Sequence, residues 1–488
     1  MLRKSLTLIA ATLISGASGV AVADDYWNYA YKDFEITTVE SAGRALSLAH
    51  SVARFDTALT SIMQLSESRV RTHIYELPHK ETSQFLGEGY ESFYHSTGYE
   101  VIVVTEQAAR NSNRWHGALF GYTGSVLISG RLLRCPYWFR IGVPEVFANT
   151  EFEVEQIKTG WVPAGYSRTL TLSNLIPTRV LLRMQGGDPQ LQNLEYRRVF
   201  EAESWFLAYE ILVRGKLKAE FSQYLGLLRD GKSEEDAFAA SFKLSHEDLD
   251  KELLKAMREP AYSFTVKVPR EPTEHSDPRR LTESEAKARL ADLNLRFGHR
   301  ADALQLATEA VREDAGDELG LSVAARANLR DGNFGAALPP VEKLDALPAV
   351  SAAGRTDAGD VLAALADAVA SKKASIGVDA ETLSHRSKDE YERAISLDSD
   401  YLRAWAGLAY LYGLRHDSAA AQVFSKRAHA VMEKHTENGA LARALATMCS
   451  RTGQVSDAAF FGQLWVNNAP SETDRERAVS FVAQIQAH

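Results

Sequence analysis

The chain has 488 residues, of which 45% are hydrophobic and 24% are charged, so it holds enough apolar material for buried cores in about two to four domains. Its formal net charge is -9 and no basic cluster stands out, which argues against the basic patch typical of nucleic-acid-binding proteins. Only two cysteines occur, Cys135 and Cys449. This count excludes a disulfide-dense scaffold and leaves a single bridge between distant halves of the chain as an open alternative.

The first residues indicate export. A short basic start precedes an apolar run rich in small residues, and the tripeptide ending at Ala23 matches an A-x-A cleavage site directly before Asp24. This arrangement predicts a cleaved secretory signal peptide over residues 1–23 and a periplasmic location for the mature chain. A membrane anchor is the alternative, but serines and glycines interrupt the run, which is too weakly apolar for a good spanning helix. No later stretch is a candidate span.

The next region mixes strand and helix patterns. Apolar residues three or four apart between Ala45 and Ile62 indicate a helix, and the pattern becomes helical again from about Arg114. Runs that alternate, or that are rich in β-branched residues, predict strands. The predicted strands are 34–39, 69–77 and 99–105. Strands first and helices later predict an α+β domain over residues 24–262.

A polar stretch with several prolines follows over residues 263–281 and predicts a linker. Beyond it, residues 282–488 are rich in Ala and Leu and almost wholly helical in pattern. Gly332 lies 34 residues after Gly298, which is the spacing of tetratricopeptide (TPR) repeats. The sequence therefore predicts a TPR-like solenoid of stacked helical hairpins, with a generic helical bundle as the alternative.

The repeats are not uniform. A clear unit is predicted over residues 391–413, where small and large residues fall at the packing positions of a TPR hairpin. The next unit is marked by Gly453, which follows Gly413 by 40 residues, so this spacing is irregular. The stretch 339–380 fits the repeat poorly and indicates a divergent unit.

The stretch from 115 to 152 carries the pattern in which chemistry is expected. In order along it stand Tyr122, Thr123, Pro136, Trp138, Gly142, Glu145 and Phe147. This order resembles the peptidase MA-like, gluzincin-type families of bacterial exported proteins. Their helix carries His-Glu-Tyr-Thr-His and precedes a Pro-x-Trp-x-x-Glu-Gly-x-Ala-Glu-Tyr-Phe segment. Weaker landmarks, such as Ser204-Trp205, extend the resemblance over about residues 33–258, which implies a zincin-like front domain.

A zinc peptidase of this kind needs two imidazoles four residues apart on one helix face, a carboxylate as third ligand, and a Glu that takes a proton from zinc-bound water. The resemblance places the first His at Phe120, the general base at Gly121, the second His at Gly124 and the third ligand at Ile141. None of these side chains coordinates zinc, and no two of the 13 histidines are four residues apart. We therefore predict no catalytic residue, metal or cofactor, and a structural hydrogen-bond role for Glu145.

The function predicted from these observations is an exported, non-catalytic binding or scaffold protein. Protein or peptide partners would bind the TPR-like groove and the cleft in which an active peptidase of this kind would hold its substrate. An active metal-dependent hydrolase with a rearranged site is the alternative, and it requires His95, His116 and Glu145 to converge. In a third interpretation the front domain is a spacer and the repeats carry all binding.

Overall fold

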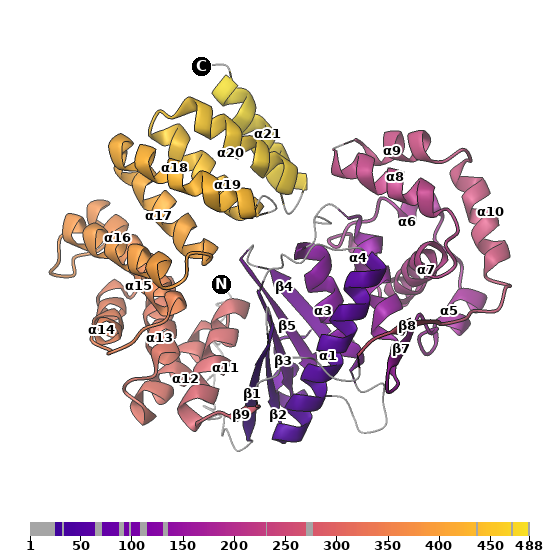
Figure 1. Cartoon of the computed structure of the whole chain (residues 1–488), viewed down its shortest axis with the longest axis horizontal. Helices are drawn as coiled ribbons and strands as arrows, with labels where there is room; N and C mark the ends of the chain where they lie inside the picture. Colours follow the sequence, from indigo (N-terminus) through magenta and orange to yellow (C-terminus); the bar gives the residue numbers. More distant parts are fainter. Residues whose placement is uncertain are drawn as a thin grey trace, which may run out of the picture.

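The structure, a computed structural model, describes residues 25–31, 34–63, 71–86, 92–96, 99–107, 115–129, 135–230, 232–269, 277–435, 438–469 and 472–486. The predicted signal peptide over residues 1–23 lies outside the described residues. Figure 1 shows a central sheet with helices on both sides of it. Within the described ranges, no helix combines the length and the apolar character that crossing a bilayer requires.

A mixed sheet is the centre of the front half. Its strands lie in the order β4-β5-β3-β2-β1-β9, with β2, β3 and β5 parallel and the outer pairs antiparallel. The strands are β1 (Tyr26–Tyr31), β2 (Phe34–Val39), β3 (Arg71–Leu77), β4 (Ser92–Ser96), β5 (Glu100–Glu106) and β9 (Arg279–Arg280). The strands predicted at 34–39 and 99–105 are confirmed to within one residue at each end. The strand predicted at 69–77 is confirmed from residue 71, and residues 69 and 70 lie outside the described part of the chain.

One face of this sheet is covered by two helices, α1 (Ala42–Met63) and α3 (His116–Ser129). Successive side chains of a strand point to opposite faces. The side chains that point to this face are apolar on three neighbouring strands, at Ile36, Ile74 and Val103. The apolar stripe predicted over 45–62 packs in the same core, which confirms the helix read from its spacing.

Beyond α3 the chain forms a layer of helices and a small second sheet. The helices are α4 (Tyr137–Ala148), α5 (Tyr166–Leu172), α6 (Thr178–Leu181), α7 (Leu194–Leu212), α8 (Lys218–Arg229), α9 (Glu234–Ser241) and α10 (His246–Ala256), with the short α2 (His79–Thr82) and the 3-10 turn η1 (Pro189–Gln192). The second sheet has the order β6-β7-β8, with β6 (Glu151–Phe152), β7 (Gln156–Thr159) and β8 (Phe264–Lys267). The long helix α7 packs against α4 and is buried along most of its length.

The C-terminal part is an array of helical hairpins. Its helices are α11 (Glu283–Phe297), α12 (Arg300–Glu313), α13 (Glu318–Arg330), α14 (Phe334–Asp345), α15 (Ala352–Ala370), α16 (Ala380–Leu397), α17 (Leu402–Arg415), α18 (Ser418–Lys434), α19 (Gly439–Arg451), α20 (Val455–Asn468) and α21 (Glu472–Gln486). Each odd-numbered helix from α11 to α19 packs against the helix that follows it, and those from α11 to α17 also pack against the next odd-numbered helix. In Figure 1 the odd-numbered helices from α11 to α19 form the inner side of an arc, toward the sheet. This is the architecture of a TPR-like solenoid.

The inner helices from α11 to α19 end in a similar way, at or just before a residue of the left-handed conformation. These residues are Gly298, Gly332, Lys372, His416 and Gly453, with φ of 90, 76, 57, 52 and 78°. Glycine takes this conformation without strain and commonly ends helices. The spacing of 34 residues predicted from the first two glycines is therefore confirmed as a structural repeat. The stretch 339–380, predicted as a divergent unit, contains the end of α14 and the whole of α15, and α15 pairs with α16, which begins at the last residue of the stretch.

One repeat position was assigned wrongly from the sequence. Gly413, taken as the counterpart of Gly453, lies inside α17 rather than at its end. A Cβ at Gly413 would lie 3.2 Å from the Cα of Met448, so this glycine lets α17 approach α19 closely. The counterpart of Gly453 is His416, and the two are 37 residues apart.

The second face of the central sheet is covered by the first inner helix of the array, α11. The strand residues that point to this face pack with apolar residues around α11 in one cluster, which includes Tyr26, Val39, Tyr75, Leu77, Ile102, Val104, Leu281, Leu290 and Leu293. Part of the predicted linker 263–281 is also structured, since it contains β8 and β9, and β9 pairs with β1. The front half and the array therefore share a hydrophobic core.

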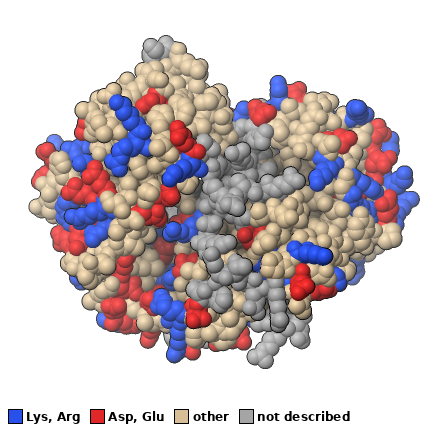
Figure 2. Space-filling view, viewed as in Figure 1, with Lys and Arg blue, Asp and Glu red and all other residues tan. Residues whose placement is uncertain are grey.

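The far end of the array returns to the front half. Arg475 of α21 donates a hydrogen bond of 3.4 Å to the carbonyl of Asp230, which directly follows α8. The array thus contacts the front half at both of its ends. On the face seen in Figure 2, acidic and basic side chains are interspersed over the array.

Candidate functional site

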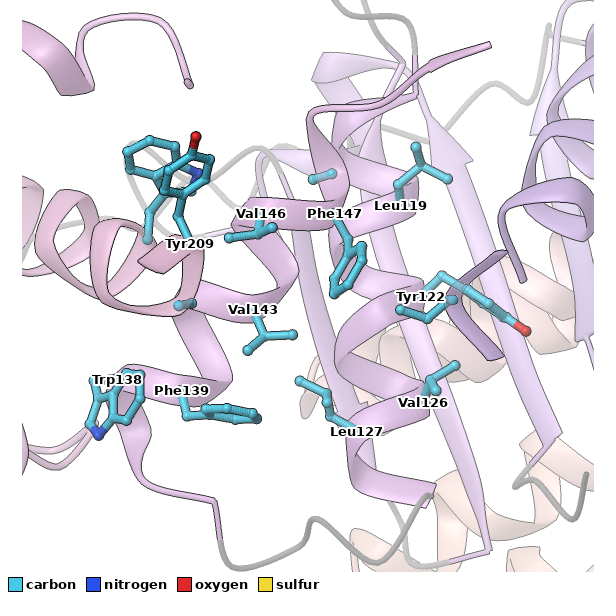
Figure 3. Close-up of a cluster of buried hydrophobic side chains, with 14 of the residues drawn as sticks. Leu119, Tyr122, Val126, Leu127, Trp138, Phe139, Val143, Val146, Phe147 and Tyr209 are labelled. Carbon is cyan, nitrogen blue, oxygen red and sulfur yellow. The ribbon is translucent and has the colours of Figure 1, made fainter. Parts of the chain in front are cut away.

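The predicted motif positions 120–124 lie on α3, which packs against α4. In Figure 3, apolar side chains of α3 and α4 fill the space between the two helices. The labelled residues of this cluster are Leu119, Tyr122, Val126 and Leu127 of α3, Trp138, Phe139, Val143, Val146 and Phe147 of α4, and Tyr209 of α7. The matched segment is therefore the centre of the front core.

Two of the degenerate motif positions, Gly121 and Gly124, press α3 against the sheet. A Cβ at Gly121 would lie 2.1 Å from Cγ1 of Val103 on β5, and a Cβ at Gly124 would lie 2.4 Å from the ring of Tyr94 on β4. At separations under 3 Å something must shift, so a larger residue at either position displaces the side chain of Val103 or Tyr94, or the helix itself. Close approach of helix and sheet thus explains why both positions are glycine.

The other two degenerate positions are apolar and half-buried. Phe120 lies between two rings, with its centroid 6.4 Å from that of Tyr94 and 6.5 Å from that of His116. Ile141 of α4 packs at the edge of the same core. Both side chains contribute apolar contacts where the resemblance implies zinc ligands.

The retained motif residues have structural roles. Tyr122 donates a hydrogen bond of 2.8 Å to Asp56 of α1, and Thr123 donates one of 2.7 Å to the carbonyl of Leu119. Pro136 precedes the first turn of α4, and Trp138 and Phe147 are fully buried. A Cβ at Gly142 would lie 2.0 Å from the carbonyl oxygen of Ser204, so this glycine allows α4 to cross α7 closely.

Glu145, the retained motif carboxylate, pairs with His116. Its Oε2 lies 3.2 Å from Nε2 of His116, and the two side chains are 14% and 22% exposed. Glu201 of α7 interacts electrostatically with Glu145. Burial raises the pKa of Glu201 to about 7, Arg197 opposes this shift, and Glu145 adds to it. Glu145 thus joins α3 to α4 electrostatically, and a neighbouring carboxyl titrates near neutrality.

His95 does not join this pair. Phe93 and His95 are two residues apart on β4 and share one face, and the ring of Phe93 packs against Phe297 at the end of α11. Tyr94 points to the opposite face, where it meets α3. The convergence of His95, His116 and Glu145 that a rearranged hydrolase site requires is therefore wrong, because the sheet separates His95 from the other two.

No other cluster in the described residues replaces it. Among them, no group of three or more His, Cys, Asp or Glu side chains is placed to hold a metal ion. Cys135 and Cys449 are both free, one beside α4 and the other buried in α19, so they do not pair. Burial raises the pKa of the Cys135 thiol, and Arg140 only partly opposes that shift.

No family model matches the chain, and no curated relative matches it. Solved structures with some likeness are TPR proteins. TTC0263, a thermophilic TPR protein from Thermus thermophilus, has 20% identity over 41% of this chain and 99% of its own, with a TM-score of 0.33. YrrB, a TPR protein with an unusual peptide-binding site, has 12% identity over 40% and 90%, with a TM-score of 0.28. PilW, a type IV pilus biogenesis factor, has 15% identity over 42% and 90%, with a TM-score of 0.32.

The structure also shows a buried carboxyl that the sequence analysis did not single out. Glu203 of α7 is 5% exposed and accepts a hydrogen bond of 2.7 Å from the backbone N–H of Ile176. Burial raises its pKa to about 8, the Ile176 hydrogen bond opposes that shift, and Asp250 adds to it. Glu203 is therefore largely protonated at neutral pH and fixes the loop before α6 to α7.

Proposed function

We propose that the protein is an exported, non-catalytic binding protein of the cell envelope. Its front half keeps the shape of a metallopeptidase-like domain after the reaction was lost, and its array is a scaffold for protein contacts. The observation that carries this proposal is the packing of Gly121 on Val103 and of Gly124 on Tyr94. Gly121 and Gly124 stand where the resemblance implies the general base and the second imidazole, and both allow α3 to pack closely on the sheet.

Export to the periplasm is supported by the signal-peptide pattern that ends at Ala23. The scaffold role is supported by the stacked hairpins, since solenoids present extended surfaces to protein partners.

Two measurements on the purified mature chain test the absence of catalysis. Metal analysis by mass spectrometry is expected to find zinc far below one ion per chain. A peptide-hydrolysis assay is expected to give no activity that responds to a chelator. Stoichiometric tightly bound zinc, lost together with hydrolysis when the chelator is added, would refute the proposal.

Partner binding is tested by cross-linking the mature chain in periplasmic extract and identifying the captured proteins. The full chain is the proper bait, because α11 and the sheet share one core and each half alone would expose it. Reproducible capture of one protein or peptide is expected. Failure to enrich any protein over a bait-free control would contradict a binding role.

A further inference from the structure

Ion pairs join the sheet to the first helix of the array. Glu35 of β2 lies 2.6 Å from Arg289, and Glu100 of β5 lies 2.5 Å from Arg296, both arginines belonging to α11. The two carboxylates stand on strands that flank β3 on either side. Two ion pairs therefore fix the position of α11 across three strands.

His73 of β3 lies between these two ion pairs. Its Nδ1 is 3.2 Å from Glu35 and its Nε2 is 3.8 Å from Glu100, and its side chain is 22% exposed. The register places Glu35 directly beside His73. A single imidazole thus contacts both carboxylates that hold the array.

The charged groups that act on this histidine are Glu35 of β2, Glu100 of β5, and Arg289 and Arg296 of α11. Further titratable groups interact with the same carboxylates and arginines, namely Tyr75 of β3, His95 of β4 and Asp292 of α11. Asp292 pairs with Arg296 and with Arg326 of α13, and Arg326 pairs with Asp357 of α15. The charges at the sheet are therefore linked to the inner helices further along the array.

We propose that Glu35, His73 and Glu100 form an acid-sensitive latch that holds α11, and with it the inner side of the array, against the sheet. When His73 is neutral, both carboxylates are free to pair with the arginines of α11. When His73 takes a proton, it competes for the same carboxylates and adds a third positive charge beside Arg289 and Arg296. The latch does not depend on which partner the protein binds.

The direction of the pH effect follows from the shifts. Burial lowers the pKa of His73, Glu35 and Glu100 oppose this, and Arg296 and Arg289 add to it, so the net shift is downward. If α11 is released, His73 loses both arginines and keeps both carboxylates, so its pKa rises. The latched state thus binds fewer protons, and the latch weakens as pH falls below about 6.5, the ordinary pKa of histidine.

The carboxylates act in the same direction but at lower pH. Burial opposes the ionised form of Glu100, but Arg296 and His73 outweigh it and lower its pKa. Glu35 is likewise lowered by Arg289 and His73 against the effect of burial. Their contribution is lost only below about pH 4.5, so between pH 7 and pH 5 the effect belongs to His73.

Hydrogen–deuterium exchange on the full mature chain tests the latch, with rates corrected for the intrinsic effect of pH. Protection in α11 and β3 is expected to fall selectively from pH 7.5 to pH 5.0, because the latched state binds fewer protons than the released one. Protection in α19 and α20 serves as the internal reference and is expected to hold. The variant His73→Gln should remove the selective loss. The control His79→Gln changes an exposed histidine that pairs with Glu106, and it should behave as the wild type.

Three results would overturn the latch. One is unchanged protection of α11 and β3 in the wild type at pH 5.0. Another is an equal loss in α19 and α20, which would mean global unfolding. The third is the same selective loss in His73→Gln as in the wild type. If His73→Gln does not fold by circular dichroism, the wild-type profile still decides, because its first two outcomes remain decisive.

Discussion

Replacing Glu203 by glutamine should stabilise the protein at neutral pH. The carboxyl is 5% exposed and its pKa is about 8, against 4.5 ordinarily. At pH 7 the folded state keeps the proton and the unfolded state releases it, which costs stability. The difference of about 2.5 units between pH 7 and 4.5, at about 1.36 kcal/mol per unit, gives an upper limit of about 3 kcal/mol. Glutamine is neutral at every pH and its carbonyl can still accept the Ile176 N–H.

The sign of this effect fixes its pH dependence. Because the pKa of Glu203 is raised in the folded state, its contribution to stability is fully present below pH 4.5 and is lost as pH rises toward 8. Urea unfolding at pH 5, 6, 7 and 8, followed by tryptophan fluorescence, should show Glu203→Gln gaining on the wild type with each step. The control is Glu195→Gln, an exposed residue of the same helix, with a change within about 0.5 kcal/mol. Parallel pH profiles for wild type and Glu203→Gln would refute the reasoning.

Three further predictions concern packing, charge and export. Gly124→Ala should lower the free energy of unfolding by roughly 1–3 kcal/mol, because its Cβ meets the ring of Tyr94. The control Gly226→Ala, with open space around it, should be neutral or slightly stabilising. Equal effects in chemical unfolding would contradict the close packing of α3. Arg326→Ala should cost roughly 1.5–3 kcal/mol because it removes one of the two arginines that pair with each of two buried aspartates. Asp292 keeps Arg296 and Asp357 keeps Arg403, and the exposed Arg300→Ala should cost less than about 1 kcal/mol. Mass spectrometry of the exported chain should show cleavage after Ala23, and an uncleaved N-terminus in the periplasm would contradict the signal peptide.

The elements found from the sequence were those with a local period. The helix over 45–62 has apolar residues every three to four positions, and the strand over 34–39 alternates with a period of two, although the sheet buries both of its faces. β9 has two residues and pairs with β1, which lies about 250 residues earlier, so no local pattern announces it. The linker was predicted from the prolines of the stretch 263–281, but part of that stretch belongs to the two sheets.

The candidate site shows the same limit. The absence of zinc-binding side chains at these positions was readable from residue types alone, but the reason for glycine at 121 and 124 lies on strands that are distant in the sequence. Two signals were present and not used. Alternation along β4 already sets His95 and Tyr94 on opposite faces. Glu203 follows Phe200 by three residues and precedes Leu207 by four, so the helical period places it among buried side chains.

The contacts of the array with the front half have a mechanical consequence. The helix α11 is seated on the sheet and α21 reaches the end of α8. Between these ends, Arg71 of β3 lies over the ring of Tyr401 and Tyr99 packs against the core of the array, so the arc is held along its length. Insertion or removal of one hairpin would shift the far support by a whole repeat, and the number of hairpins is thereby tied to the width of the front half.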